Sequence, residues 1–342
     1  MKKFGTTKVV AMAVMALVAG LCFSAVNSYA AGEECKPIKL KASSFGSPQY
    51  VQRLIFERAM KTIEEKSNGG ISFEYYPGAS LLKLTQTFNA LKNNIVQVAI
   101  TFDGYERGRM GILSSSSILP FSWDIDKWHQ RWRKAGMYYE FAEPFWNDYN
   151  MHLLAVPRVH AGALHSREPI HKLEDFKGKL LRISPGLAPA VKGLGAEPTF
   201  ISLGELYSAL QKGVVDGGFS SMSNYVGKKR YEVAPYLTVC NFYSGTLQHA
   251  MNLDTYKSLC PKWRKIFDEA FEEAEHWWAG QVYKIFEEQL AEVKAGGGKI
   301  YHVPADELGR WKKATEPFWK DLQENYPKDY PRLMELVEQI DK

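Results

Sequence analysis

The chain has 342 residues, of which 45% are hydrophobic and 24% charged, with 43 basic against 38 acidic residues. This length suggests two domains. The near balance of charge argues against a nucleic-acid-binding protein, which needs a concentrated basic face. The basic runs at 228–230 and 312–313 are short and interleaved with acids, so we predict that they lie on solvated helix faces.

The first thirty residues have the pattern of a secretory signal peptide. Three lysines accompany an apolar stretch from 9 to 26, and Ser28 and Ala30 are small residues at the two positions that a signal peptidase reads. We predict cleavage after Ala30 and export to the periplasm as a soluble mature chain with a net charge of +2. A retained N-terminal anchor is the alternative.

Strands and helices then alternate along the chain. The expected strands are 38–42, 71–76, 96–100, 153–156, 178–184, 197–201, 214–218 and 299–303. The expected helices are 51–63, 87–92, 188–194 and 203–211, followed by two closing helices after the last strand. This alternation predicts α/β lobes with mainly parallel sheets.

Two other segments carry a clear expectation. From 261 to about 294 an apolar stripe recurs at the helical period, which predicts one long helix that packs across both lobes. The run Ser114–Ser117 is interpreted as a loop.

Three cysteines remain in the mature chain, namely Cys35, Cys240 and Cys260. An oxidising compartment permits one disulfide and leaves one thiol over. We predict that Cys240 pairs with Cys260, with three free cysteines as the alternative.

Signatures of catalysis and of metal or cofactor binding are missing. The chain has no Gly-x-Ser-x-Gly or His-Glu-x-x-His motif and no complete phosphate-binding or dinucleotide-binding loop. His160, His165 and His171 lie close together in the sequence, but their spacing fits no metal site, so we interpret them as surface or hydrogen-bonded histidines. We therefore expect neither an enzyme nor a cofactor.

Arg182 is the candidate binding residue. It lies near the end of a strand suited to burial, just before Pro185-Gly186 and a helix. Open α/β sheets bind ligands at the carboxyl ends of their strands, and a guanidinium there can hold a carboxylate through two parallel hydrogen bonds. A strand-edge arginine paired with a nearby acid is the alternative.

The segment 173–182, Leu-Glu-Asp-Phe-Lys-Gly-Lys-Leu-Leu-Arg, closely resembles a segment of the solute-binding proteins of TRAP (tripartite ATP-independent periplasmic) transporters, the DctP-like family. The resemblance continues through 193–198 and 205–217, and it includes 119–121 and 298–308. It covers essentially the whole mature chain.

The resemblance implies a two-lobed α/β fold of the periplasmic-binding-protein type (type II-like), with hinge strands and a long helix spanning both lobes. The implied division is a signal peptide at 1–30, lobe I at 31–157, lobe II at 158–247, a return to lobe I with the start of the long helix at 248–280, and C-terminal helices on lobe II at 281–342.

The resemblance also implies a function. Such a protein closes over a small organic acid and delivers it to a large and a small membrane permease subunit. Arg182 falls on the family's ligand-binding arginine. A sensor module that presents the acid to a membrane receptor is the alternative, and a periplasmic enzyme is a weaker one. We expect a monomer.

The chain departs from the family at several binding positions. Ser220 replaces an asparagine that contacts the ligand, Leu203 replaces a frequent aromatic, and Arg158 is the only candidate for a second arginine. These departures favour a monocarboxylate with an apolar or aromatic part. The further candidates for ligand contact are Ser44, Phe45, Asp103, Tyr105, Trp123, Phe219 and Asn224.

Overall fold

The structure is a computed structural model that describes residues 35–116, 119–121, 127, 137–158, 162–240, 242 and 247–341. The predicted signal peptide, His160 and Trp123 lie outside these residues. All elements named below belong to one unit that begins at Ile38. In the described part of the chain, no helix combines the length and the apolar character needed to cross a membrane.

The first sheet has the strand order β2-β1-β3-β10-β4. Its strands are β1 (Ile38–Ser43), β2 (Ile71–Tyr76), β3 (Val98–Thr101), β4 (Met151–Ala155) and β10 (Gln248–Asn252). β1 runs parallel to β2 and β3, whereas β10 is antiparallel to both β3 and β4. A late segment of the chain therefore completes the sheet that the first strands begin.

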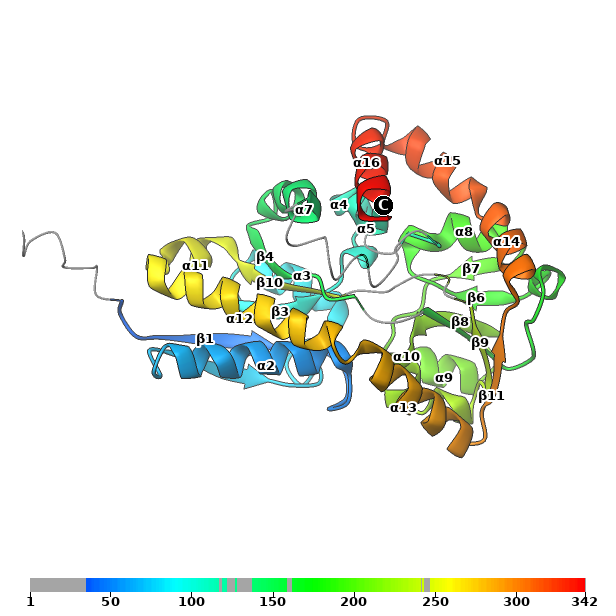
Figure 1. The fold of residues 1–342 in the computed structure, drawn as a ribbon, viewed down its shortest axis with the longest axis horizontal. Helices are drawn as coiled ribbons and strands as arrows, with labels where there is room; N and C mark the ends of the chain where they lie inside the picture. Colours follow the sequence, from blue (N-terminus) through cyan, green and yellow to red (C-terminus); the bar gives the residue numbers. More distant parts are fainter. Residues whose placement is uncertain are drawn as a thin grey trace, which may run out of the picture. The chain divides into compact units, whose positions relative to one another are not determined.

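Helices α2 (Val51–Lys66) and α12 (Pro261–Ala279) pack against each other along this sheet (Figure 1). Both helices bury an apolar face at the helical period, which in α2 includes Ile55, Phe56, Ala59 and Ile63. The other helices of this region are α3 (Leu84–Lys92), α4 (Arg107–Met110), α5 (Leu113–Ser116), α7 (Met137–Asn147) and α11 (Leu253–Ser258), with the 3-10 turn η1 (Asp103–Tyr105).

The second sheet has the order β11-β9-β5-β8-β6-β7. Its strands are β5 (Gly162–Ser166), β6 (Leu180–Arg182), β7 (Glu197–Thr199), β8 (Gly217–Ser221), β9 (Tyr236–Val239) and β11 (Lys299–His302). β6 lies parallel to β7 and β8, and β5 is antiparallel to β8 and β9. The carboxyl ends of β6 and β8 therefore meet at one edge of the sheet.

The remaining helices lie in the segments 173–232 and 282–341. They are α8 (Ala188–Gly193), α9 (Leu206–Gln211), α10 (Met222–Gly227), α13 (Val282–Ala295), α14 (Ala305–Ala314), α15 (Glu316–Asn325) and α16 (Tyr330–Asp341), with the 3-10 turns η2 (Leu173–Phe176), η3 (Pro185–Leu187) and η4 (Arg230–Glu232). α13 packs on α10 and β11, α15 packs on α8, and α16 contacts α7.

Most of the expected elements are confirmed, and the two-sheet α/β class holds. The strand expected at 214–218 begins three residues later, at Gly217. The sequence reading missed β5, β9 and β10. These strands are short, and β10 is buried along its whole length although it contains Gln248 and His249. The alternation of apolar and polar residues that marks a half-buried strand is therefore absent.

The expected long helix is two helices in the structure. α12 ends at Ala279 with Gly280 as its C-cap, and α13 begins at Val282. Glycine has a low helix propensity because its backbone loses the most freedom on ordering. The break separates the part that packs on α2 and β4 from the part that packs on α10 and β11.

The serine run is helical where the structure describes it, which corrects the loop interpretation. Ser114, Ser115 and Ser116 lie in α5. The hydroxyl of Ser114 donates to the carbonyl of Gly111, and that of Ser115 donates to the carbonyl of Gly186. These bonds satisfy the short side chains inside a helical turn.

The predicted Cys240–Cys260 disulfide is wrong. Cys240 is a free, buried thiol, whereas Cys35 and Cys260 are each disulfide-bonded. Cys240 follows β9 and is enclosed by the second sheet, and Cys260 is the N-cap of α12 on the first sheet. The two residues belong to different sheets, a separation that their spacing in the sequence did not reveal.

Candidate functional site

Arg182 ends β6 and is 2% exposed. It pairs with Thr199 of β7 on one side and with Gly218 of β8 on the other. A Cβ atom at position 218 would lie 3.0 Å from the Cβ of Arg182 and 3.1 Å from its carbonyl oxygen. Glycine at 218 therefore gives the arginine room at the sheet edge.

Three hydrogen bonds hold the Arg182 guanidinium. Nε donates to the carbonyl of Ile201 at 2.7 Å, Nη1 to the carbonyl of Phe219 at 2.9 Å, and Nη2 to the hydroxyl of Tyr105 at 3.1 Å. A guanidinium has five N–H groups. Among the described residues, one N–H on each terminal nitrogen therefore remains for a ligand.

The positive charge of Arg182 is not balanced by the described part of the protein. Its three acceptors are uncharged, and among the described residues no aspartate or glutamate forms an ion pair with it. The alternative of an arginine paired with a nearby acid thus finds no support in these residues. A buried charge is costly unless it is paired, so the site is suited to an anion.

Tyr105 links the two sheets at this point. It lies in η1, directly after β3, and its hydroxyl also accepts from the backbone N–H of Leu203 at 3.2 Å. Its ring packs edge-on against Phe102 and Phe200. The next residue, Glu106, is half-buried, and burial raises the pKa of its carboxyl group. Tyr105, which directly follows a strand of the first sheet, thus contacts the Arg182 guanidinium of the second sheet.

Aromatic rings line the strand next to Arg182. Phe219 is fully buried in β8, and its ring stacks on Phe242 with the centroids 4.5 Å apart. Phe121 packs edge-on against the other ring of this pair, Phe242, at 5.3 Å. The carbonyl of Phe219 accepts from Arg182, so the backbone of this residue contacts the guanidinium. Arg182 pairs with Gly218, and the side chain of Phe219 therefore lies on the other face of β8.

A second buried arginine, which the sequence reading missed, completes this region. Arg230 lies in η4 and is 0% exposed, although its basic run was interpreted as a solvated helix face. It donates to Asn224 Oδ1 at 2.6 Å, to the Leu203 carbonyl at 2.6 Å and to Ser220 Oγ at 3.4 Å. Three predicted site residues thus meet around an arginine that was not predicted.

The folded structure, and not the sequence, sets Arg230 apart from the two lysines before it. Lys229 adopts a left-handed backbone conformation with φ of 48°, which ends α10 and turns the chain. Tyr231, the residue after the arginine, is buried in an apolar cluster with Tyr225 and Leu237. A basic run interrupted by a turn and followed by a buried aromatic is not a uniform solvated face.

The remaining predicted residues are placed as follows. Asp103 begins η1, is fully buried, and donates its backbone N–H to Gln248 Oε1 at 3.0 Å. The hydroxyl of Ser44 bonds to Tyr75 at 2.5 Å, and Phe45 packs on Tyr50. These contacts do not join Ser44 or Phe45 to the group around Arg182.

Arg158 is fully buried, and its carbonyl accepts from the indole N–H of Trp278 at 2.6 Å. This contact anchors it to α12. Trp123 lies outside the described residues. His165 is buried in β5, and His171 stacks on Tyr301 with the ring centroids 4.0 Å apart. Within the described residues, no three histidine, cysteine, aspartate or glutamate side chains are grouped as a metal site.

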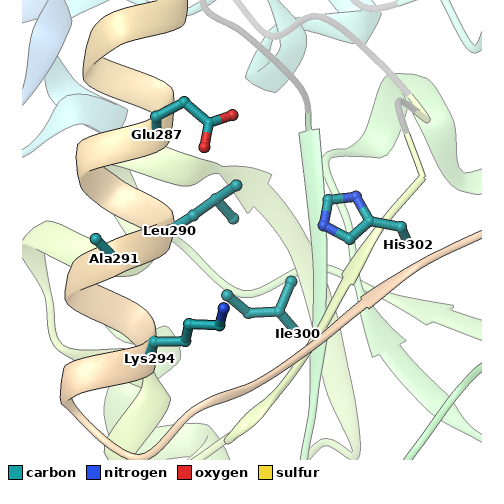
Figure 2. Close-up of a pocket in the computed structure, with 6 residues that line it drawn as sticks. All are labelled: Glu287, Leu290, Ala291, Lys294, Ile300 and His302. Atoms are coloured by element: carbon teal, nitrogen blue, oxygen red, sulfur yellow. The ribbon is translucent and has the colours of Figure 1, made fainter.

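A separate surface pocket of about 350 Å³ lies between α13 and β11. Figure 2 shows Leu290 and Lys294 of the helix facing Ile300 of the strand. The lining residues are Glu287, Leu290, Ala291, Lys294, Ile300 and His302. None of them bonds to Arg182 or Arg230, so this pocket is distinct from the arginine site.

Two sheets with parallel strands, a late strand that returns to the first sheet, and a buried arginine at a carboxyl edge define the class of two-lobed solute-binding proteins. The family model of the bacterial extracellular solute-binding proteins, family 7 (DctP), matches residues 42–325. The chain therefore belongs to this family, which comprises the solute receptors of TRAP transporters.

Two curated relatives and one solved structure illustrate the match. The C4-dicarboxylate-binding protein DctB of Bacillus subtilis is 27% identical and covers 80% of this chain and 79% of its own length. DctP of Rhodobacter capsulatus is 26% identical, covering 84% and 87%. A TRAP periplasmic solute-binding protein of Desulfovibrio salexigens with bound orotic acid superimposes with a TM-score of 0.82 at 20% identity, over 88% of this chain and 98% of that one.

Proteins of this class are periplasmic, bind small organic acids and work with membrane permease components. They are transport proteins and not enzymes. These properties agree with the expectation from the sequence. The signal peptide, the lobe boundaries and the monomeric state remain predictions.

Proposed function

We propose that this protein is the receptor of a TRAP transporter for a monocarboxylate with an apolar or aromatic part. In this proposal, Arg182 holds the carboxylate and the loaded receptor delivers it to the membrane permease. The observation that carries the proposal is the buried Arg182 guanidinium, whose hydrogen bonds within the described chain all go to uncharged oxygens.

A carboxylate is the group that such a guanidinium is best suited to bind. Its two oxygens match the two terminal nitrogens of arginine in a bidentate, charge-assisted contact. The bonds from Arg182 to Ile201, Phe219 and Tyr105 fix the plane of the guanidinium before the ligand arrives. Little side-chain entropy is then lost on binding.

The aromatic residues beside Arg182 support an apolar or aromatic remainder. Tyr105, whose hydroxyl accepts from Arg182, packs its ring edge-on against Phe102 and Phe200, and aromatic rings contribute both apolar area and specific ring–ring contacts. The Desulfovibrio salexigens protein holds orotic acid, a ring that bears one carboxyl group. The relatives named for C4-dicarboxylates make dicarboxylates the competing class of ligand.

A thermal-shift screen tests the proposal, with titration calorimetry of each hit. The probes are aliphatic and aromatic monocarboxylates, orotate, malate and malonate. A ligand at about 100 times its dissociation constant adds about 2.7 kcal/mol of stability, which raises the melting temperature by roughly 5–10 °C in a chain of this size. We expect the largest shifts from monocarboxylates.

The Arg182→Ala variant should lose this binding. Truncating one partner of a buried charged pair costs about 2–5 kcal/mol, which weakens affinity about 30-fold or more. Arg332→Ala is the matched control, because Arg332 is an exposed arginine paired with Glu335 on the surface, and it should bind as the wild type does. Unchanged affinity in Arg182→Ala would falsify the arginine contact. Preference for malate or malonate would contradict the monocarboxylate part.

A further inference from the structure

On one face of the first sheet, three buried polar atoms have no hydrogen-bond partner in the described part of the chain. They are Ser43 Oγ, Thr101 Oγ1 and Gln248 Nε2. All three side chains are 0% exposed. Most buried polar atoms in native proteins are hydrogen-bonded, and each exception requires an explanation.

The three residues lie on one face of the sheet. Thr101 of β3 is the direct partner of Gln248 of β10, and Ser43 of β1 is the partner of Ala99, two residues before Thr101. Residues two apart on a strand, and direct partners across a ladder, share a face. His249 lies on the opposite face, where its ring packs against Phe56.

These residues also lie where α/β sheets bind ligands. Ser43 and Thr101 are the last residues of two parallel strands, so they stand at the carboxyl edge of the first sheet. The same Gln248 accepts from the backbone of Asp103, which begins η1, and the turn ends at Tyr105, the residue bonded to Arg182. One 3-10 turn therefore separates the unpaired atoms from the guanidinium.

The chemistry of the three atoms specifies what they bind. The Gln248 amide nitrogen can only donate, whereas the two hydroxyls donate or accept. Their partner is therefore an oxygen acceptor. None of the three side chains is charged, and a second carboxylate buried beside them would lack the cation that buried anions need. The matching group is an uncharged oxygen, namely a hydroxyl or a carbonyl.

We propose that the ligand carries, besides its carboxylate, an uncharged hydroxyl or carbonyl oxygen that Ser43, Thr101 and Gln248 recognise. This inference rests on the proposed function and narrows it to hydroxy and oxo carboxylic acids. Arg182 selects the acid, and the polar face of the first sheet selects the oxygen substituent.

Titration calorimetry with matched acids tests the inference. The oxygenated probes are phenylpyruvate, 3-phenyllactate and 4-methyl-2-oxopentanoate, and the probes that lack the extra oxygen are 3-phenylpropanoate and 4-methylpentanoate. We expect the wild type to bind at least one oxygenated acid tenfold or more tightly than its unsubstituted counterpart. Thr101→Val should reduce this ratio of affinities to near one and leave the affinity for the unsubstituted acid within about twofold.

Two neighbouring serines provide a matched control. Ser43→Ala should lower the ratio, whereas Ser44→Ala should leave it unchanged, because the Ser44 hydroxyl bonds to Tyr75. Melting curves identify any variant that does not fold. If the other variants fail to fold, the affinity ratio of Thr101→Val, which keeps the shape of the side chain, is the test of the oxygen contact.

The possible outcomes separate this inference from the proposed function. One contrary result is that the wild type binds both kinds of acid equally, and another is that Thr101→Val keeps the wild-type ratio of affinities. Either result contradicts the proposed oxygen contact and leaves the proposed carboxylate receptor unaffected. If no acid of either kind binds to the wild type, both proposals fall. Loss of all binding in Arg182→Ala together with loss of the ratio in Thr101→Val supports both.

Discussion

The two sheets bury polar groups in opposite ways. The second sheet and its loops enclose two guanidinium groups, those of Arg182 and Arg230, each held by backbone or side-chain oxygens. The first sheet encloses uncharged groups at its edge, such as Thr101 and Gln248, and leaves polar atoms of both without a partner among the described residues. The two guanidinium groups of the second sheet are thus held by oxygens, whereas these uncharged groups of the first sheet keep hydrogen-bonding atoms that no described residue uses.

The histidines of the first sheet sharpen this contrast. His249, on the inner strand β10, is fully buried, and burial lowers the pKa of its ring to about 3. His152, on the outer strand β4, is partly exposed. Burial acts to lower its pKa as well, but hydrogen bonds with Asp268 and Glu143 outweigh that effect and raise the pKa to about 9. In this sheet the pKa of a histidine is thus lowered where burial dominates and raised where carboxylates lie beside the ring.

The largest effect on stability is expected at Arg230. Arg230→Met removes the donor to the Leu203 carbonyl, Asn224 and Ser220 at once. Buried acceptors without a donor are costly, so we expect a loss of about 3 kcal/mol and a drop in melting temperature of roughly 6–12 °C. Calorimetry of the purified variant measures it.

Lys228→Met is the control for Arg230, because Lys228 is an exposed residue of the same basic run. It should change stability by at most about 0.5 kcal/mol. Equal effects of the two substitutions would show that the hydrogen bonds of Arg230 do not stabilise the fold. Of the two arginines, only Arg182 would then support the contrast between the two sheets.

The next effect is the pH dependence that His249 imposes on the first sheet. In the folded chain its pKa is about 3, so it stays neutral, whereas in the unfolded chain it takes up a proton below its ordinary pKa of 6.5. Its contribution is therefore fully present above pH 6.5 and is lost as the pH falls from about 6.5 to about 3. The slope of about 1.4 kcal/mol per pH unit gives a loss of about 2 kcal/mol by pH 5.

Urea denaturation at pH 7 and pH 5 measures this loss. His249→Leu should remove it, because leucine has a similar volume and does not titrate. If wild type and variant lose equal stability between these two pH values, the neutral histidine is not the source of the loss, and strand β10 tolerates a charged histidine.

The smallest effect is expected at the link between the sheets. Tyr105→Phe removes the hydroxyl that accepts from Arg182 and from the backbone of Leu203. The ring contacts with Phe102 and Phe200 remain, so we expect a loss of about 1 kcal/mol in binding, or about fivefold in affinity. Titration with the best acid of the screen checks this value. No change in affinity would mean that the guanidinium needs no acceptor from the first sheet.

The sequence predicted much of the fold because most strands and helices carry strong periodic patterns. The sequence also marked Arg182 as an arginine at the end of a buried strand, since it interrupts an apolar run shortly before Pro185-Gly186. Leu203, Phe219, Ser220 and Asn224 lie around the two arginines, near the positions that the family resemblance indicated.

What the sequence could not predict depends on contacts between distant segments. Arg230 looks like one of three surface cations until η4 folds it beneath Leu203. Thr101 and Gln248 are 147 positions apart and become partners only when β10 returns to the first sheet. The helix break needed no distant contact, because Gly280 marks it, but the strong apolar stripe on both sides concealed the signal.

The free cysteine has a consequence for how this protein acquires its disulfide-bonded cysteines. Thiol–disulfide exchange requires a thiolate. Burial raises the pKa of the Cys240 thiol to about 12, so at pH 7 the thiolate is much rarer than for an ordinary cysteine. Once β9 has joined the second sheet, Cys240 no longer competes with Cys35 and Cys260 for oxidation. Mispairing with Cys240 is therefore confined to the stage of folding before that sheet forms.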